Sequence, residues 1–479
     1  MVLLIQLLVV KKIMGKNKLR IDFSNGEAAQ HVTGSCIYLP DLEILLECGL
    51  SQSNSLERDY RENNEKFSFS CKKIKYIIVG HCHLDHIGRI PLLYKRGCNA
   101  DIVVPTGNIN IMRNMLEDSV KILERDALLL TKQKKREYTP LYTQDDVDTA
   151  LSHIKEYDFH ELIQLNEELT IKFIPSGHIR HGAQVELFIN HNNVKKKLVY
   201  TSDLGNSLLP KYFSETFEPI EKCDVLIGEC TYADKNRQAA TPKLRKLDIE
   251  KIESIIWTYC VDNHSKILIP CFALDRTPEM FMIIRGILKQ HNWDIPVIID
   301  SPLAVKQFKI YGAECPELWE EVEHSNTKLC SDWDDSVQYQ KMNGPAIILS
   351  SSGMLTAGRV LQYLPHILAD QNACILFCGY STEGTLAYEI KHGHKKCLNV
   401  AGKKIPNRAN IISLHSFSSH MQHDQLLDYY SSIKCDKIFL VHGQQTEKVQ
   451  FAAELREQIE KNASTTQVVC ANKSAEGRF

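Results

Sequence analysis

The chain has 479 residues, of which 24% are charged, and its formal net charge is −2. A chain of this length can bury a large core and is expected to hold more than one domain. The balanced charge excludes a globally basic nucleic-acid binder, so any site for a polyanion must be local. The 16 cysteines include no C-x-x-C pair. This argues against a disulfide framework and predicts reduced thiols in the cytoplasm or the nucleus.

The N-terminal stretch MVLLIQLLVV is apolar but too short to span a bilayer. Its lysines follow the apolar run instead of preceding it, which is atypical of a secretory signal. We therefore interpret residues 1–13 as an N-terminal extension, with Met14 as the ordinary start of the chain. We expect no interaction with a membrane.

Short apolar runs rich in β-branched residues recur along the chain and alternate with helical patterns. Such runs are typical of strands buried on both faces of a sheet. We predict an α/β chain with covered sheets. The predicted strands lie at 75–79, 169–174, 196–203, 224–230, 266–273, 295–300, 345–351, 373–379 and 437–443, and the predicted helices include 242–262, 275–290, 357–370 and 446–461.

The strand at 75–79 is followed by four side chains that can bind metal, in the stretch HCHLDH (81–86). Residues i and i+2 of an extended segment point to the same side, so His81 and His83 are expected to share one metal ion. Asp85 and His86 follow where the chain turns into a helix, and they are better placed for a second ion. Zinc accepts imidazole and carboxylate ligands, whereas unpaired polar groups kept merely for packing would be costly here.

Three more strand ends carry candidate ligands. They are His178 in IPSGHIRHGAQ, Asp203 in LVYTSDLGN and His442 in FLVHGQ. Each of them alone is more often a satisfied structural residue. Together they predict two ions with Asp203 bridging, one held by His81, His83 and His178 and the other by Asp85, His86 and His442.

The polar clusters at strand ends change along the chain. They are rich in His, Asp and Glu before about residue 235, in Ser, Gly and Arg from 236 to 390, and in His again afterwards, in SFSSHMQHD and LVHGQ. The simplest organisation is one metal-binding domain formed by 14–235 and 391–479, with a second α/β unit inserted at 236–390. The charge run KQKKR (132–136) is interpreted as a solvated helix end.

The sequence resembles a known family. HCHLDH matches the H-x-H-x-D-H motif of the metallo-β-lactamase fold, and the rest of the chain looks like its β-CASP branch of nucleic-acid-processing nucleases. The resemblance covers roughly residues 23–445, and it is nearest to mRNA 3′-end processing endonucleases, their Integrator counterpart and short prokaryotic relatives. It implies an αββα sandwich with an inserted α/β β-CASP domain. The supporting segments are AAQHVTGSC (28–36), PLYTQDDV (140–147), GECTYAD (228–234) and IPCFALDRTPE (269–279), followed in family order by SSSGML, GYSTEGT, SFSSH and LVHG.

The resemblance also implies roles for individual residues. The family's metal ligands fall on the same seven positions, its catalytic non-ligand histidine falls on His420, and the acidic partner of that histidine falls on Glu229. Two zinc ions per chain would activate a water that hydrolyses phosphodiester bonds of single-stranded RNA. Asp85 and Asp203 would serve catalysis as well as metal binding, and His420 would protonate the leaving oxygen. The enzyme is expected to be an endonuclease, with or without 5′→3′ exonuclease action.

Four positions depart from the family's pattern, and none of them is a ligand. Glu47 in LLECG stands for an aspartate that orients the ligands from behind, and its extra methylene is expected to shift that geometry. If Glu47 keeps this role, Glu47→Asp should leave activity equal or higher. His181 and Asp275 replace glycines of the pattern, and Gln422 replaces an aspartate.

The inserted unit is expected to close over the metals and to contact the phosphates of a single strand. The candidate contacts are Arg276, Ser351, Ser352 and Gly353, although a plain turn explains the Ser-Gly stretch almost as well. The expected partners are single-stranded RNA and a second copy or a paralogous chain. The expected location is the cytoplasm, or the nucleus in a eukaryote.

Three other functions compete with an RNA-cutting enzyme. A DNA-processing β-CASP nuclease is disfavoured because that subgroup typically has a small apolar residue at the position of His442. A hydrolase for a small molecule would not need the inserted unit. A non-catalytic scaffold would be expected to lose ligands, and this chain keeps all seven.

Overall fold

The computed structural model describes residues 19–23, 35–53, 55–192, 194–207, 213–379, 381, 384–393, 395–400, 402–471 and 476–478. The predicted extension at 1–13 and all but the last two residues of AAQHVTGSC (28–36) lie outside these ranges. The chain divides into two compact units. The first unit comprises Met1–Gly205, Glu215–Arg237 and His420–Phe479, and the inserted unit comprises Asn206–Ser214 and Gln238–Ser419.

The first unit contains two seven-stranded sheets. One has the order β22-β1-β2-β3-β4-β5-β6, and the strands from β3 to β6 run parallel. The other has the order β21-β20-β11-β10-β9-β8-β7, with an antiparallel half from β7 to β10 and a parallel half from β10 to β21. The bounds are β1 (Arg20–Phe23), β2 (Ile37–Leu39), β3 (Ile44–Leu46), β4 (Tyr76–Ile78), β5 (Asp101–Pro105), β6 (Ile154–Tyr157), β7 (Ile163–Gln164), β8 (Leu169–Pro175), β9 (Ala183–His191), β10 (Val194–Tyr200), β11 (Val225–Glu229), β20 (Lys437–Val441), β21 (Gln467–Cys470) and β22 (Glu476–Arg478).

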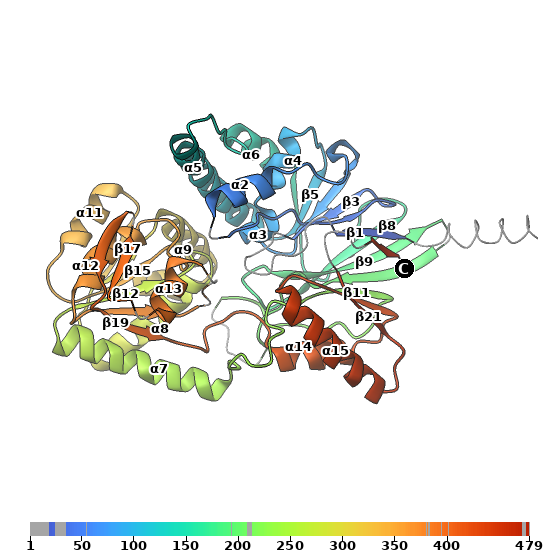
Figure 1. Cartoon of the computed structure of the whole chain (residues 1–479). Coiled ribbons are helices and arrows are strands. Elements are labelled where there is room, and N and C mark those ends of the chain that lie inside the picture. Colours follow the sequence, from blue (N-terminus) through green and yellow to red (C-terminus); the bar gives the residue numbers. More distant parts are fainter. Residues whose placement is uncertain are drawn as a thin grey trace, which may run out of the picture. The chain divides into compact units, whose positions relative to one another are not determined.

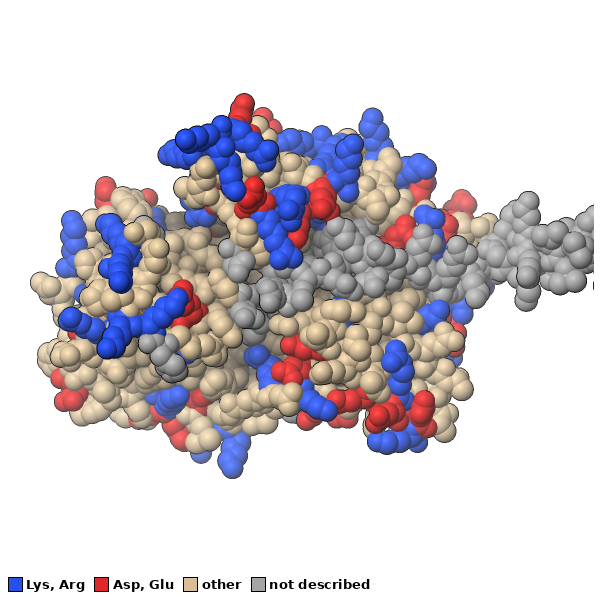
Figure 2. All heavy atoms as spheres, in the orientation of Figure 1, with Lys and Arg blue, Asp and Glu red and all other residues tan. Residues whose placement is uncertain are grey.

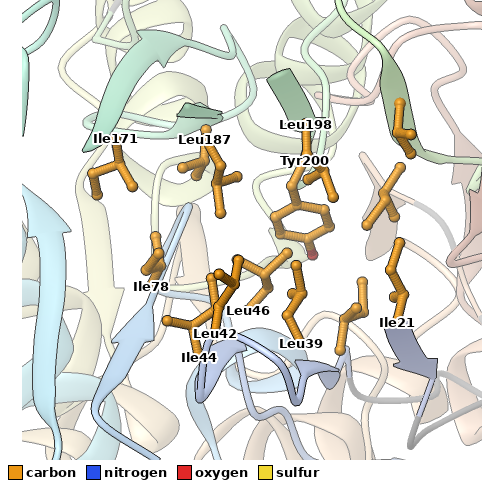
Figure 3. Close-up of a cluster of buried hydrophobic side chains, with 14 of the residues drawn as sticks. Ile21, Leu39, Leu42, Ile44, Leu46, Ile78, Ile171, Leu187, Leu198 and Tyr200 are labelled. Carbon is orange, nitrogen blue, oxygen red and sulfur yellow. The ribbon is translucent and has the colours of Figure 1, made fainter. Parts of the chain in front are cut away.

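The core of the first unit lies between its two sheets. Ile44, Leu46 and Ile78 of one sheet face Leu187 and Leu198 of the other, and all five are fully buried (Figure 3). Each such side chain stabilises the fold by about 1.5–3 kcal/mol relative to an exposed one. Because successive residues of a strand point to opposite faces, the neighbouring apolar residues serve the outer faces, which explains the continuous apolar runs in the sequence.

Helices cover the outer faces of both sheets (Figure 1). On the second sheet, Leu226 and Leu440 pack in one cluster with Leu426 of α14 and Phe451 of α15. The unit is therefore a helix–sheet–sheet–helix sandwich, as predicted. The bounds of its helices are α2 (Leu56–Asn64), α3 (Leu84–Ile87), α4 (Ile90–Lys95), α5 (Asn108–Lys134), α6 (Gln144–Leu151), α14 (His423–Ser432) and α15 (Gln445–Lys461), with a 3-10 turn at Cys71–Lys73.

The surface carries charges of both signs, in keeping with the small net charge (Figure 2). Lys and Arg gather over the end of α5 in this view, where all five residues of KQKKR (132–136) are exposed. Lys135 ends that helix in the left-handed conformation, with φ at 52°. The run is thus a solvated helix end, as predicted. Within the described ranges, no helix is both long and apolar enough to cross a membrane.

The inserted unit is built on a six-stranded parallel sheet of order β14-β13-β15-β12-β16-β19. It continues to Ser419, beyond the expected boundary at residue 390, because β19 pairs with β16. The predicted helix at 242–262 ends in a π-helical turn, Trp257–Asp262. The bounds are β12 (Lys266–Pro270), β13 (Val297–Asp300), β14 (Thr327–Cys330), β15 (Ala346–Ser350), β16 (Cys374–Phe377), β17 (Cys397–Val400), β18 (Lys403–Pro406), β19 (Asn410–Ser413), α7 (Pro242–Ile256), α8 (Arg276–His291), α9 (Pro302–Glu314), α10 (Pro316–Glu323), α11 (Trp333–Lys341), α12 (Val360–Ala369) and α13 (Leu386–His392).

Candidate metal centre

All seven predicted ligands lie in the first unit, where the strands end and the chain turns. β4 leads into His81 and the short helix α3, and β8, β10 and β20 lead into the other three loops. Parallel and antiparallel pairing brings these strand ends to one edge of the sandwich. The ligands that follow them are His178 after β8, Asp203 after β10 and His442 after β20.

The first ligand group comprises His81, His83, His178 and Asp203. His83 Nδ1 lies 3.1 Å from His81 Nε2 and 3.4 Å from His178 Nε2. Asp203 Oδ2 lies 3.6 Å from His81 Nε2 and 3.7 Å from His178 Nε2. Three imidazole nitrogens and one carboxylate oxygen therefore converge on one point, which is a donor set suited to zinc.

The second group comprises Asp85, His86 and His442. Asp85 Oδ2 lies 3.4 Å from His442 Nε2 and 3.7 Å from His86 Nε2. Asp203 reaches this group too, because its Oδ2 lies 3.3 Å from His86 Nε2 and its Oδ1 lies 3.7 Å from His442 Nδ1. The structure thus places Asp203 between the two groups.

Among the described residues, His86 Nε2, His442 Nε2 and Asp203 Oδ1 are buried atoms of this centre without a hydrogen-bond partner. A buried polar atom without a partner is costly. Meanwhile, the opposite nitrogen of each of three histidines is already occupied. Nδ1 of His81 contacts the Ser202 hydroxyl at 3.0 Å, Nδ1 of His86 contacts Glu47 Oε2 at 2.5 Å, and Nδ1 of His442 contacts the Thr231 hydroxyl at 2.8 Å. Such partners leave Nε2 turned toward the centre, as metal sites require. The residues present therefore fit bound metal.

The electrostatics of the two groups differ. Burial lowers the pKa of His81 well below its ordinary value and lowers the pKa of His83 to about 4. Both are then neutral at pH 7, the form that binds metal. Burial also acts to lower the pKa of His86, but the carboxylates of Glu47, Asp203 and Asp85 outweigh it and raise that pKa well above the ordinary value.

The carboxylates of the centre stay ionised. Burial acts to raise the pKa of Asp85, but His86 and His442 outweigh it and lower the pKa to about 2. The same two histidines hold the pKa of Asp203 well below its usual range, again against the effect of burial. Negative charge is therefore concentrated where cations would bind.

Glu229 and His420 form a pair beside the ligands. Glu229 ends β11 and is almost fully buried, and its two carboxylate oxygens accept hydrogen bonds from the backbone N–H of Leu204 at 2.9 Å and of Thr231 at 2.8 Å. His420 Nδ1 lies 3.4 Å from Glu229 Oε1, and His420 Nε2 lies 4.0 Å from Asp203 Oδ2. With Glu229 fixed by the backbone, one ring nitrogen of His420 is oriented and the other faces the centre.

Glu47 lies directly behind the ligands. It follows β3, is fully buried and stands close enough to His81 and His86 to count as a third candidate ligand group. Its oxygens are already engaged, however, since it accepts hydrogen bonds from Gly80 N and from the hydroxyls of Tyr200 and Ser202 besides His86. Its acceptor positions are therefore taken, and its role in orienting the ligands stays a prediction.

Two further departures from the family pattern, His181 and Gln422, have local partners. His181 has φ at 58°, in the region that favours glycine, and its backbone N–H donates to Glu215 Oε2 at 2.8 Å. Gln422 begins α14 with a capping box and donates from Nε2 to the His420 carbonyl at 2.7 Å. Gln422 thus holds the backbone of His420. Asp275 has φ at 61° just before α8 in the inserted unit.

The four predicted phosphate contacts lie in the inserted unit. Arg276 is buried and its guanidinium is engaged by Glu279 and by the Ser419 hydroxyl, which makes it a poor phosphate ligand. Ser352 accepts from the backbone N–H of Thr356 at 3.2 Å, as a turn residue does. Ser351, two residues before Gly353, has a hydroxyl without a hydrogen-bond partner in the described ranges. Ser351 therefore keeps a hydroxyl that could still meet a phosphate.

Sequence reasoning missed the partners that orient the histidines. Ser202 directly precedes Asp203, Tyr200 lies three residues before Asp203, and Thr231 lies two residues after Glu229. None of the three belongs to a metal-ligand type. One local feature points to Ser202: it has a positive φ of 49°, where glycine is favoured, so a serine there needs a reason.

Three family models match separate stretches of the chain. The metallo-beta-lactamase superfamily matches residues 34–159, the Beta-Casp domain matches 277–390, and the Zn-dependent metallo-hydrolase RNA specificity domain matches 404–465. The last stretch contains both His420 and His442.

Several curated proteins are similar over most of the chain. Ribonuclease TTHA0252 of Thermus thermophilus is 27% identical over 434 residues, which cover 87% of this chain and 92% of that protein. The RNase J-like protein of Methanocaldococcus jannaschii is 29% identical, with 88% and 92% covered. Integrator complex subunit 11 of Danio rerio is 26% identical, with 93% and 72% covered.

Proposed function

This chain belongs to the β-CASP group of the metallo-β-lactamase superfamily, and we propose that it is a zinc-dependent ribonuclease that hydrolyses phosphodiester bonds of single-stranded RNA. The residues at the metal centre support the reaction class, and the relatives support the substrate.

The position of Asp203 is the main evidence that the reaction is a hydrolysis assisted by two metal ions. Its Oδ2 lies 3.3–3.7 Å from Nε2 of His81, His86 and His178, which belong to both ligand groups. One carboxylate shared by two donor sets is typical of two-metal hydrolases, whose ions lie about 3.5–4 Å apart. We therefore propose two zinc ions per chain, with the ligand sets predicted from the sequence.

Zinc held there would supply a water that ionises near neutral pH and positive charge for the phosphate. The chain's own residues supply the proton and the orientation. His420 directs Nε2 toward Asp203 and can donate its proton to the departing 3′ oxygen. Glu229, anchored by two backbone N–H groups, orients His420 from its other nitrogen. Products with a 5′-phosphate and a 3′-hydroxyl follow.

The comparisons support RNA as the substrate, and two structural features fit a single strand and a reducing compartment. Two relatives carry ribonuclease names, and the family model over 404–465 is described as an RNA specificity domain. His81, His86 and Asp203 are at most 2% exposed, so a flexible single strand can bring a phosphodiester to them more readily than a stiff duplex can. All 16 cysteines have free thiols, which suits the reducing cytoplasm or nucleus.

The test combines metal analysis with a matched digestion. Elemental analysis of the purified chain should find two zinc ions, and end-labelled single-stranded RNA should be cut while DNA of the same sequence is not. Products should carry a 5′-phosphate, and a chelator should abolish the reaction. Equal or faster cutting of DNA would overturn the substrate, and 2′,3′-cyclic phosphate ends would overturn the mechanism, because they would make the RNA's own 2′-hydroxyl the nucleophile.

A further inference from the structure

The carboxylate of Glu47 receives four hydrogen bonds. Oε1 accepts from the backbone N–H of Gly80 at 3.1 Å and from the Ser202 hydroxyl at 2.7 Å. Oε2 accepts from the Tyr200 hydroxyl at 2.5 Å and lies 2.5 Å from His86 Nδ1. A carboxylate has about four acceptor positions. Every position of this fully buried group is therefore filled, and its orientation is fixed.

Ser202 joins Glu47 to a second histidine. While its hydroxyl donates to Glu47, the same oxygen lies 3.0 Å from His81 Nδ1 and can accept the ring N–H. A hydroxyl has one donor and two acceptor positions, so both contacts are compatible. With the proton of His81 held at Nδ1, its Nε2 keeps a lone pair facing the first ligand group.

The backbone shows that this hydroxyl is retained at a cost. Ser202 has φ at 49°, in the left-handed region, which is less favourable for any residue with a Cβ than for glycine. The space for its side chain exists because residue 80 is glycine: a Cβ there would come within 2.4 Å of Ser202 Cβ and 2.5 Å of its Oγ. Gly80 thus leaves room for the Ser202 side chain, and both residues donate hydrogen bonds to Glu47.

We propose that Ser202 is a positioning residue that couples the two ligand groups to one carboxylate. Glu47 orients His86 of the second group directly and His81 of the first group through the Ser202 hydroxyl. The proposal rests on the metal centre of the proposed function, and it assigns to Ser202 no contact with substrate. Loss of Glu47 should therefore disturb both ligand groups, whereas loss of Ser202 should disturb the first group, and the effect of Ser202 should depend on Glu47.

The test measures zinc affinity instead of cleavage. Zinc is titrated against a chromophoric chelator into wild type, Ser202→Ala and Ser202→Gly, with Ser152→Ala as the control that removes an exposed hydroxyl of the same unit. Loss of such an outer partner weakens metal binding about 10–100-fold. We expect this loss in both Ser202 variants and none in the control. Ser202→Gly suits the positive φ, so it keeps the test valid where Ser202→Ala fails to fold.

A double-mutant cycle that combines Ser202→Ala with Glu47→Gln tests whether the two residues act together on zinc binding. Replacing zinc by cobalt(II) adds a spectroscopic readout. We expect Ser202→Ala to weaken zinc binding far less in the Glu47→Gln background than in wild type, and to shift the visible bands of bound cobalt. Additive effects of the two changes, or unchanged affinity and bands in both Ser202 variants, would overturn the proposal. Wild-type protein that binds no zinc would instead refute the proposed function itself.

Discussion

Replacing His420 by alanine separates proton transfer from metal binding. His420 stands next to the ligands, yet its Nδ1 faces Glu229 and its Nε2 is 4.0 Å from the nearest Asp203 oxygen. The change therefore removes the proposed proton donor and leaves all seven ligands in place. We expect His420→Ala to retain both zinc ions and to cut RNA slowly.

The structure bounds the size of the effect. A positioned general acid contributes about 10²–10⁴-fold, which corresponds to about 2.7–5.4 kcal/mol of transition-state stabilisation. The His420 side chain is 19% exposed, and its contact with Glu229 is 3.4 Å long. Water can therefore reach the vacated position and replace part of the proton donation. We expect a loss of about 10²–10³-fold, toward the lower end of that range.

The assay compares single-turnover rates on end-labelled RNA with a substrate whose leaving 3′ oxygen is replaced by sulfur. A thiolate leaves without a proton, so the variant should cut the sulfur substrate nearly as fast as wild type does. Zinc content is measured on the same samples. Loss of zinc would make His420 a ligand, and an undiminished rate defect on the sulfur substrate would refute its role as general acid.

Three further predictions follow from other residues. His83→Ala should lose zinc and abolish cleavage, because His83 Nδ1 lies within 3.4 Å of both other histidines of its group; elemental analysis and the RNA assay check this. Glu47→Asp, expected from the sequence to be neutral or better, should instead weaken zinc binding, since a shorter carboxylate cannot reach all four donors; a chelator titration decides. Burial raises the pKa of Asp59 to about 6, so the folded chain holds this proton more tightly than the unfolded chain, and its contribution to stability is lost as the pH rises from about 4 to 6. Asp59→Asn should therefore raise the melting temperature at pH 7.5 but not at pH 4, and an equal shift at both pH values would contradict this.

The strands, and the residues that the structure gathers into candidate metal groups, could be predicted because their evidence is local. The run at 75–79 reads as a strand since Ile77 and Ile78 are buried on opposite faces, and HCHLDH follows it directly. The partners that orient the ligands could not be predicted. Ser202 is 155 residues from Glu47 and 121 from His81, and only the pairing of distant strands brings the three together.

The solvent exposure of single side chains and the bounds of the inserted unit could not be predicted from the sequence either. Arg276 reads as a free cation beside a conspicuous motif, yet the fold buries it against Glu279, three residues further along α8. The inserted unit likewise extends past residue 390 because β19 joins its sheet, and no composition change marks that pairing. Both differences come from tertiary contacts that outweigh local pattern.

The crossings between the two units have a mechanical consequence. The chain first leaves the first unit after Gly205, two residues beyond Asp203, and makes its last return at His420, and Gly205 and His420 form an isolated antiparallel bridge. One residue outward, Asn206 N–H donates to the Ser419 carbonyl at 2.9 Å. A pull on either connecting segment is thus shared by both through these hydrogen bonds. Because Asp203 and His420 each lie within two residues of these hydrogen bonds, we expect a displacement of either segment to move both residues together.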